Sequence, residues 1–157
     1  MNKDLEAGAL LREAARLHLQ LQRETSSCCG VTTLTQCTLI TELGRSGSLT
    51  LAELGRRVGL DKSWTSRAVE NLVQEGLLTK IPSETDRRNV IISLSSAGQK
   101  RYAELNLSLN NQAHQVMQHI PPGERENVHH ALQLLYEALQ LEAKQVAANS
   151  SDECQIT

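Results

Sequence analysis

The stretch "LTLAELGRRVGLDKSWTSRAVENLVQEGLL", residues 49–78, decides the fold of this chain. A capping box at residues 50–53 predicts a short helix, which Gly59 ends. Asp61 is then placed to cap a second helix, predicted over residues 62–75, which a further glycine stops. Two short helices joined by a tight turn that contains glycine form a helix-turn-helix.

The second of these helices has two different faces. Its interior positions recur at spacings of three and four and are Thr65, Ala68, Val69 and Leu72. Its opposite positions are polar and mostly uncharged, namely Ser63, Arg67, Glu70, Asn71 and Gln74. A helix that only had to be solvated would favour Glu–Lys pairs there. Side chains that donate and accept hydrogen bonds at base edges instead favour a reader of the DNA major groove.

A hairpin is predicted directly after this helix, in the stretch "LLTKIPSETDRRNVIISL", residues 77–94. Two apolar, β-favouring runs flank a polar turn, and residues 90–94 alternate as in a half-buried strand. Arg87 and Arg88 fall at the tip of the hairpin. Narrow minor grooves of DNA attract such arginines. The hairpin is therefore interpreted as the wing of a winged helix-turn-helix.

Helical periodicity continues on both sides of this core. Before it, we predict a helix over residues 3–24 and another that begins at the capping box of Thr33 and ends near Gly44. After the hairpin, a long helix is expected over residues 96–119. The sequence "IPPGE" separates it from a last helix that runs to about Ala148.

The predicted fold class is mainly α-helical with a small β-hairpin wing. We expect a single domain over residues 1–157. Its winged helix-turn-helix lobe is predicted over residues 32–94, with long helices over 3–24 and 96–148, and with a disordered polar tail over 149–157.

The composition gives little indication of a partner by itself. The 157 residues carry a formal net charge of −2, and residues 50–90 hold seven basic against six acidic side chains. A case for DNA binding must therefore rest on geometry. No apolar stretch approaches membrane-spanning length and no signal segment is recognisable, so we expect a cytoplasmic protein without a membrane partner and with reduced thiols.

Enzyme motifs are missing from the sequence. It contains no Ser-His-Asp order, no paired carboxylates, no glycine-rich phosphate loop and no HExxH. We therefore predict that the protein is not an enzyme.

The segment from residue 50 to residue 98 closely resembles the winged helix-turn-helix core of MarR-type (multiple antibiotic resistance) regulators. The matching pieces are Leu54, Gly59 to Ser63, Ser66-Arg67, Leu72, Gly76-Leu77, Asp86-Arg87-Arg88, Leu94-Ser95 and Gly98. The resemblance implies a homodimer formed by the first and last helices, over residues 3–24 and 96–148, and a palindromic double-stranded operator. It also implies that the protein usually represses and is released by a ligand or a thiol reaction.

The resemblance also assigns roles to individual residues. Ser63, Ser66 and Arg67 are expected on the recognition helix, and one wing arginine in the minor groove. Asp86 is expected to hold a wing arginine in position, because a carboxylate beside phosphates is repelled. The predicted DNA-binding residues are Lys62, Ser63, Trp64, Ser66, Arg67, Asn71, Arg87 and Arg88.

Trp64 departs from the family pattern, where a small or polar residue is expected. An isolated tryptophan usually belongs to a core. The helical wheel, however, places Trp64 about 60° from the face centred on Arg67 and farther from the face of Ala68. We therefore favour a position at the flank of the recognition helix, near the DNA backbone or a base methyl, over a core position.

Three cysteines gather in "ETSSCCGVTTLTQC", residues 24–37. Cys28 and Cys29 are predicted in a loop just before a helix N-terminus, whose positive end favours a thiolate. The position of Cys37 best fits a small buried hydrophobic residue. For Cys37 alone, a packing role and a functional role are equally favoured. Together, Cys28, Cys29 and Cys37 are a candidate sensor, as a soft metal site or as an oxidant-reactive group.

The leading functional hypothesis is a dimeric repressor that a thiol-directed signal releases from DNA. No cofactor is required, and a thiophilic ion such as As(III) or zinc is a candidate effector. One alternative is release by a small aromatic or anionic ligand in a pocket between helices. An alternative of another class is a winged-helix protein-interaction module that does not bind DNA.

Overall fold

The computed structural model describes residues 3–28, 33–83 and 89–153 of the chain. These residues form long helices and one small antiparallel sheet, which confirms the predicted fold class. Several residues of the sequence hypotheses lie outside the described residues, namely Cys29, Asp86, Arg87 and Arg88.

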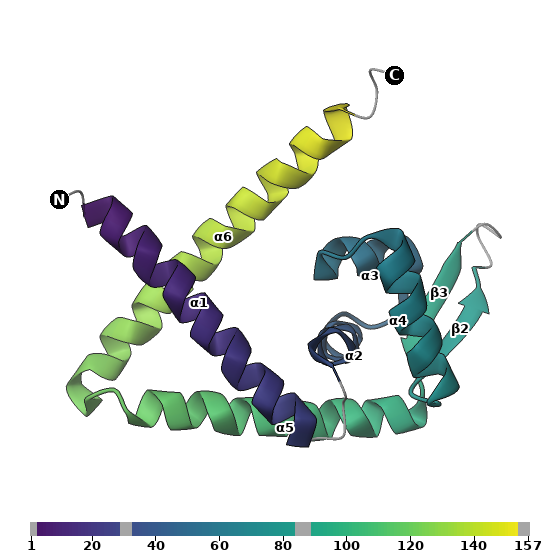
Figure 1. Cartoon of the computed structure of the whole chain (residues 1–157), viewed down its shortest axis with the longest axis horizontal. Coiled ribbons are helices and arrows are strands. Elements are labelled where there is room, and N and C mark those ends of the chain that lie inside the picture. The colour runs from purple at the N-terminus through teal and green to yellow at the C-terminus, as the bar shows by residue number, and fades with distance from the viewer. Residues whose placement is uncertain (1–2, 29–32, 84–88, 154–157) are drawn as a thin grey trace. The chain divides into compact units, whose positions relative to one another are not determined.

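The chain forms two compact units, residues 1–112 and residues 113–157, with α5 continuing from the first into the second. The first unit contains α1 Lys3–Cys28, α2 Leu34–Ser46, β1 Leu49–Thr50, α3 Leu51–Val58, α4 Lys62–Gln74, β2 Leu78–Pro82, β3 Val90–Leu94 and most of α5 Ser96–Gln118. The second unit contains the end of α5, the short 3-10 helix η1 Pro122–Glu124, and α6 Arg125–Glu153. Figure 1 shows α3, α4 and the β2–β3 hairpin gathered around α2.

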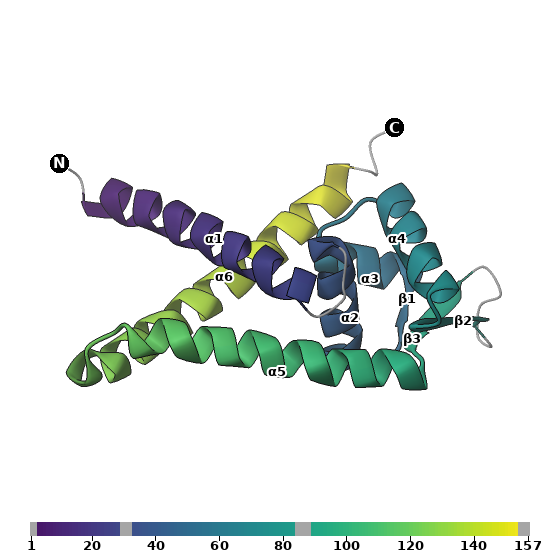
Figure 2. The same ribbon diagram turned by 60° about the horizontal axis from the view of Figure 1, so that its bottom comes forward.

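The sheet has three strands rather than the two of the predicted hairpin. Its order is β1-β3-β2, with Leu49 opposite Ile92 and Leu78 opposite Leu94. Figure 2 shows the three strands together beside α4. Strand β1 is only two residues long, so it carries no alternating pattern that the sequence alone could reveal.

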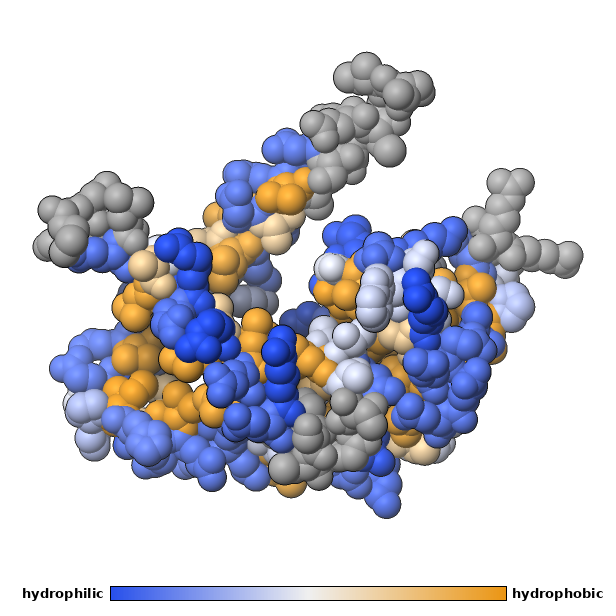
Figure 3. Space-filling model, in the orientation of Figure 1, coloured by the Kyte–Doolittle hydropathy of each residue, from blue (hydrophilic) through white to orange (hydrophobic). Residues whose placement is uncertain are grey.

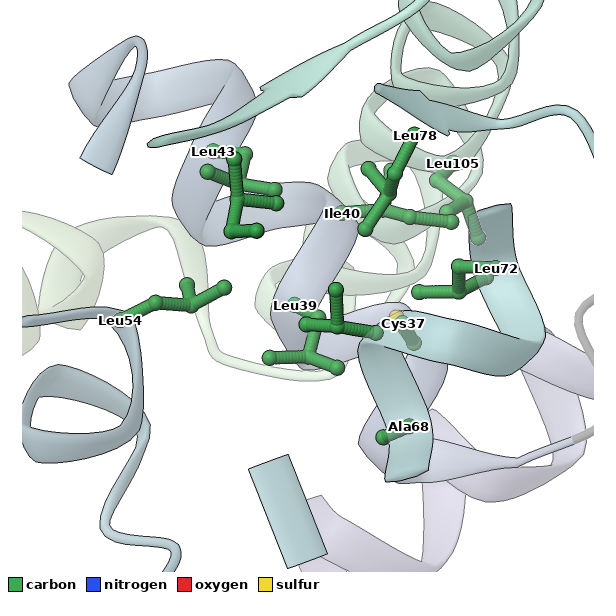
Figure 4. Close-up of a cluster of buried hydrophobic side chains, with 11 residues drawn as sticks. Cys37, Leu39, Ile40, Leu43, Leu54, Ala68, Leu72, Leu78 and Leu105 are labelled. Atoms are coloured by element: carbon green, nitrogen blue, oxygen red, sulfur yellow. The ribbon is translucent and has the colours of Figure 1, made fainter. Parts of the chain in front are cut away.

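The hydrophobic core lies inside the winged helix-turn-helix lobe. Helix α2 supplies the largest share, with Leu39 and Ile40 fully buried. The other buried apolar residues are Cys37, Leu43, Leu54, Ala68, Val69, Leu72, Leu78, Ile92 and Leu105. Figure 4 shows the α2 side chains directed toward Leu72 of α4 and Leu105 of α5. This core fixes α4 at the surface of the lobe.

All three predicted helix caps are present. The side chains of Thr33, Thr50 and Asp61 accept hydrogen bonds from the backbone N–H groups of the third helical residues, at 3.2, 3.1 and 2.8 Å. These bonds satisfy backbone donors that a helix start leaves free. The starts of α2, α3 and α4 are therefore determined locally.

The predicted end of α2 at Gly44 is wrong. The helix continues to Ser46, and Gly47, with φ of 78°, follows it. A Cβ added to Gly44 would lie 2.3 Å from the ring of Tyr102 in α5. Gly44 is therefore a point of close helix contact, since only a residue without a side chain leaves room for the tyrosine ring.

Two further helix boundaries differ from the predictions. Helix α1 runs to Cys28 instead of ending near residue 24. Helix α6 runs to Glu153, so residues 149–153 are helical and do not belong to a disordered tail. In both cases a helix continues through serine-rich sequence, because serine lowers helix propensity only slightly.

The long helices α1 and α6 expose much of their apolar surface. In α1, Leu10 is 71% exposed and Leu17 is 46% exposed, and in α6 Leu132 and Leu139 are 53% and 51% exposed. Figure 3 shows hydrophobic side chains at the surface along each helix. Over the residues that the structure describes, no helix is both long and apolar enough to cross a membrane.

Candidate nucleic-acid interface

The helix-turn-helix is held together where α3 passes closest to α4. A Cβ on Gly55 of α3 would lie 2.8 Å from the Thr65 hydroxyl of α4. Thr65 is fully buried and donates a 2.7 Å hydrogen bond to the carbonyl of Asp61, the residue that caps α4. The crossing of the two helices therefore depends on a glycine and a threonine that fit against each other.

The two faces of α4 lie as the sequence predicts. Thr65, Ala68, Val69 and Leu72 are buried against the core. On the other side, the side chains of Lys62, Ser63, Trp64, Arg67 and Asn71 are exposed, and that of Ser66 is half-buried. Trp64 is 58% exposed, so the expectation that it lies outside the core is confirmed. Its contact with DNA stays a prediction, as do those of the other candidate residues.

Much of the basic charge near α4 is neutralised within the lobe. Glu53 accepts hydrogen bonds from both Arg56 and Arg57, at 2.7 Å each. These two guanidinium groups lower the pKa of Glu53 to about 2. Lys80 of β2 lies 3.2 Å from Glu70 of α4 and so joins the stem of the wing to the recognition helix.

A second carboxylate, Glu42 of α2, connects α2 to α3. Its side chain is only 8% exposed, and it accepts hydrogen bonds from Arg45, Ser46 and Arg57. Burial opposes ionisation, but the hydrogen bonds from Ser46, Arg45 and Arg57 outweigh it and hold the pKa of Glu42 below its ordinary value. Glu42 thus fixes α3, and through α3 the start of α4. Nothing in its sequence neighbourhood signals this role.

Two basic side chains on the outer face of α4 remain available. Within residues 33–83 and 89–112, neither Lys62 nor Arg67 forms an ion pair, whereas Arg45, Arg56, Arg57 and Arg101 each pair with a carboxylate. The guanidinium carbon of Arg67 lies 5.6 Å from the centre of the Trp64 ring. The first half of α4 therefore presents two basic side chains that have no carboxylate partner in the described lobe.

The hairpin stem supports the predicted wing. Strands β2 and β3 pair from Leu78 opposite Leu94 to Pro82 opposite Val90. The backbone N–H of Ser83 then donates to the carbonyl of Asn89 at 2.9 Å. The roles predicted for Asp86, Arg87 and Arg88 fall on residues 84–88, outside the described part of the chain.

Of the three cysteines of the candidate sensor, Cys37 lies inside the described lobe, while Cys29 falls outside the described residues. Cys37 is 4% exposed and packs in the core cluster (Figure 4), as the packing alternative expects. Cys28 is the last residue of α1, so the prediction that it lies in a loop is wrong. The C-terminal end of a helix carries partial negative charge, so α1 supplies no thiolate-stabilising field there. Among the described residues, no three His, Cys, Asp or Glu side chains form a metal-binding group.

A helix-turn-helix on a buried core, with a three-stranded sheet whose β2–β3 hairpin follows the second helix, defines a winged helix-turn-helix protein. Residues 30–89 match the model of the MarR family. The resemblance to MarR-type regulators drawn from the residues is therefore confirmed over the winged-helix part of the chain.

Similar proteins of known sequence or structure agree with this assignment. An uncharacterised HTH-type transcriptional regulator, YfiV from Bacillus subtilis (strain 168), is 24% identical over 98 residues, which span 62% of this chain and 61% of YfiV. A mutant of MarR from E. coli is 18% identical, with a TM-score of 0.76 over 82% of this chain and 95% of that chain. The same mutant has been solved with operator DNA, with a TM-score of 0.69 over 85% and 96% of the two chains at 18% identity.

NadR in complex with 4-hydroxyphenylacetate also shares the fold. It is 20% identical, with a TM-score of 0.73 over 85% of this chain and 89% of that chain. YfiV carries the name of an HTH-type transcriptional regulator, a class of protein that is not enzymatic, in agreement with the expectation from the sequence.

Proposed function

We propose that the chain is a dimeric, sequence-specific DNA-binding transcription regulator that inserts α4 into the major groove of a palindromic operator. The observation that carries the proposal is the exposed, polar face of α4 with Lys62 and Arg67 unpaired within the described lobe. Lysine and arginine without internal carboxylate partners are available for phosphates and base edges. The operator complex of the E. coli MarR mutant, which has the same fold, supports this mode of binding.

A homodimer explains the exposed apolar helices. The described side chains of α1 and α6 include none that is buried, although both helices carry exposed leucines. Large exposed apolar patches generally mark interaction sites. A symmetric dimer would cover these helices and would set two copies of α4 about 34 Å apart, the separation of half-sites one helical turn apart.

Binding to labelled DNA tests this proposal directly. The promoter region upstream of the protein's own coding sequence and a scrambled duplex of equal length are titrated with protein at 50 and 200 mM salt. We expect a preference for the promoter and a loss of affinity of about a hundredfold or more across this salt range, because phosphate contacts release counterions. Equal or absent binding to both duplexes would instead favour the protein-interaction module.

We also propose that a thiol-directed signal releases the protein from DNA. Cys28 ends α1 and Cys29 follows it in the sequence before α2, so a modification there would act on the connection between an exposed helix and the core of the lobe. If As(III) or zinc is the effector, Cys37 can bind it only in a conformation in which this residue leaves its buried position.

Cysteine substitutions separate the possible triggers. DNA release by arsenite, zinc and peroxide is measured for the parent, for a Cys28→Ser/Cys29→Ser double variant, and for Cys37→Ala. We expect the double variant to stay bound under conditions that release the parent. If all three proteins respond alike, the sensor proposal is wrong and the thiols serve packing alone.

A second candidate switch is a small aromatic acid. A hollow of about 330 Å³ lies beside the start of α4 and is lined by Leu51, Ala52, Gly55, Leu60, Lys62, Asn89 and Val90. Its apolar walls and the Lys62 ammonium would suit a ring with a carboxylate, and NadR was solved with 4-hydroxyphenylacetate. Release by phenolic acids in the presence of a thiol reductant would favour this switch over the cysteine sensor.

A further inference from the structure

The contact between Trp64 and Arg67 goes beyond general DNA binding. Given the proposed function, we propose that these two side chains form one recognition unit that reads a guanine and a thymine in neighbouring base pairs of each operator half-site. Arg67 would bind the guanine edge, while the Trp64 ring would pack on the thymine methyl group.

The backbone beneath this pair is rigid. The N–H of Trp64 donates a 2.8 Å hydrogen bond to the Asp61 cap, and Thr65, the next residue, is fully buried. Trp64 and Arg67 are three residues apart and therefore share one face of the helix. Both belong to the first half of α4, the part of a recognition helix that contacts base edges.

The electrostatics favour a base contact for Arg67. Its guanidinium lies near an aromatic ring, while four other arginines of the described lobe pair with carboxylates. A ring attracts a cation through its π-face and leaves the N–H donors of the guanidinium free. A guanidinium that an aromatic ring holds in place, with its N–H donors free, is preorganised for the bidentate hydrogen bond to O6 and N7 of guanine.

The position of Trp64 favours a thymine next to that guanine. The ring is 58% exposed, and a thymine methyl group is an apolar contact in the major groove that can cover part of it. Stacked base pairs are about 3.4 Å apart along the duplex axis. The separation of 5.6 Å between the guanidinium carbon and the ring centre exceeds this rise, so the two side chains reach different base pairs rather than the same one.

Chemical probes in the DNA test the two contacts separately. The protein first selects its site from a randomised duplex pool. Within one half-site, guanine is then replaced by 7-deazaguanine, which lacks N7, and thymine by deoxyuridine, which lacks the methyl group. Affinities are measured by anisotropy of labelled DNA for the parent, Trp64→Ala, Trp64→Phe and Arg67→Ala. Lys100→Ala, at an exposed basic residue of α5 that is not among the predicted DNA-binding residues, serves as the control.

We expect the affinity of the parent for DNA to fall about fivefold or more when guanine is replaced by 7-deazaguanine, and about threefold when thymine is replaced by deoxyuridine. Arg67→Ala should become insensitive to 7-deazaguanine, and Trp64→Ala insensitive to deoxyuridine. Trp64→Ala should also lose part of the guanine preference, because no aromatic ring then holds the Arg67 guanidinium. Trp64→Phe keeps an aromatic ring and should retain the guanine preference. Lys100→Ala should respond to both probes like the parent.

Two other results overturn the inference in different ways. If Trp64→Ala keeps the parental response to both probes, the ring contacts only the sugar-phosphate backbone, and the proposed function still stands. If the parent selects no sequence from the pool, the proposed function itself fails.

Discussion

At the scale of single residues, Cys37 shows how strongly surroundings decide the role of a side chain. Its sulfur lies in a cluster of aliphatic side chains in the middle of the lobe, with 4% of the residue exposed (Figure 4). A thiol in such a place behaves as a small hydrophobic group. A polar replacement should therefore disturb the core more than an apolar one.

We expect Cys37→Ser to lower the free energy of unfolding by about 1–3 kcal/mol, because a hydroxyl would be buried among aliphatic groups. Cys37→Ala, which leaves a small cavity and no polar group, should lower the free energy of unfolding by less. Urea unfolding followed by circular dichroism measures both variants. If serine is tolerated as well as alanine, Cys37 is not held in an apolar environment in solution.

At the scale of secondary-structure elements, the recognition helix depends on groups that never face DNA. Gln36 of α2 donates a 3.0 Å hydrogen bond to Glu75 just beyond α4, while Glu42 of α2 binds Arg57 of α3. Helix α2 thus holds both partners of the helix-turn-helix through polar contacts as well as through its buried leucines. Glu42 is the member whose charge state matters most, because its side chain is almost fully buried.

Acid should loosen this connection. The folded-state pKa of Glu42 lies below its ordinary value of 4.5, so its contribution to stability is present above that value and is lost as the pH falls through the folded pKa. We expect Glu42→Gln to lower stability at pH 7 by about 1–3 kcal/mol and to weaken the decline of stability below pH 4.5.

A matched control for this measurement is Glu13→Gln. Glu13 pairs with Arg16 on the exposed surface of α1, where a single ion pair contributes little. Chemical unfolding across pH 3–7 measures stability for both variants. We expect Glu42→Gln to change the pH dependence of stability and Glu13→Gln to change it little. An acid dependence that is identical in the parent and in Glu42→Gln would show that Glu42 is not ionised in the folded lobe.

At the scale of the whole molecule, the two long terminal helices α1 and α6 leave apolar side chains exposed. Their exposed leucines, at about seven-residue spacing in Leu10 and Leu17 and in Leu132 and Leu139, form seams that a second copy can cover. Such seams differ from a membrane segment, because neither described helix is both long and apolar enough to cross a membrane. The proposed operator binding needs both copies, since each supplies one recognition helix.

We expect Leu132→Glu combined with Leu139→Glu to make the protein monomeric, because the interface would bury two unpaired charges. Sedimentation equilibrium measures the mass, and labelled operator DNA measures the affinity, which should fall with the dimer. His130→Glu, on the opposite side of α6, is the control and should leave the dimer intact. A parent protein that sediments as a monomer at micromolar concentration would contradict the proposed dimer.

The sequence by itself determined the local features of this protein. The caps at Thr33, Thr50 and Asp61 and the two faces of α4 follow from residues that lie within four positions of each other. Hydrogen bonds and helical periodicity over so short a range do not depend on the rest of the chain. For the same reason, the winged helix-turn-helix and the exposed position of Trp64 could be predicted.

Only the tertiary structure decided the features that join distant segments. Gly44 ends no helix because the Tyr102 ring, from another part of the chain, packs on it, and the two-residue strand β1 exists only because β3 pairs with it. Likewise, Arg57 pairs with Glu42 and Glu53, whereas the Arg67 guanidinium lies near the Trp64 ring. Which partner a side chain obtains depends on which segments the core brings together, and no short-range pattern carries that information.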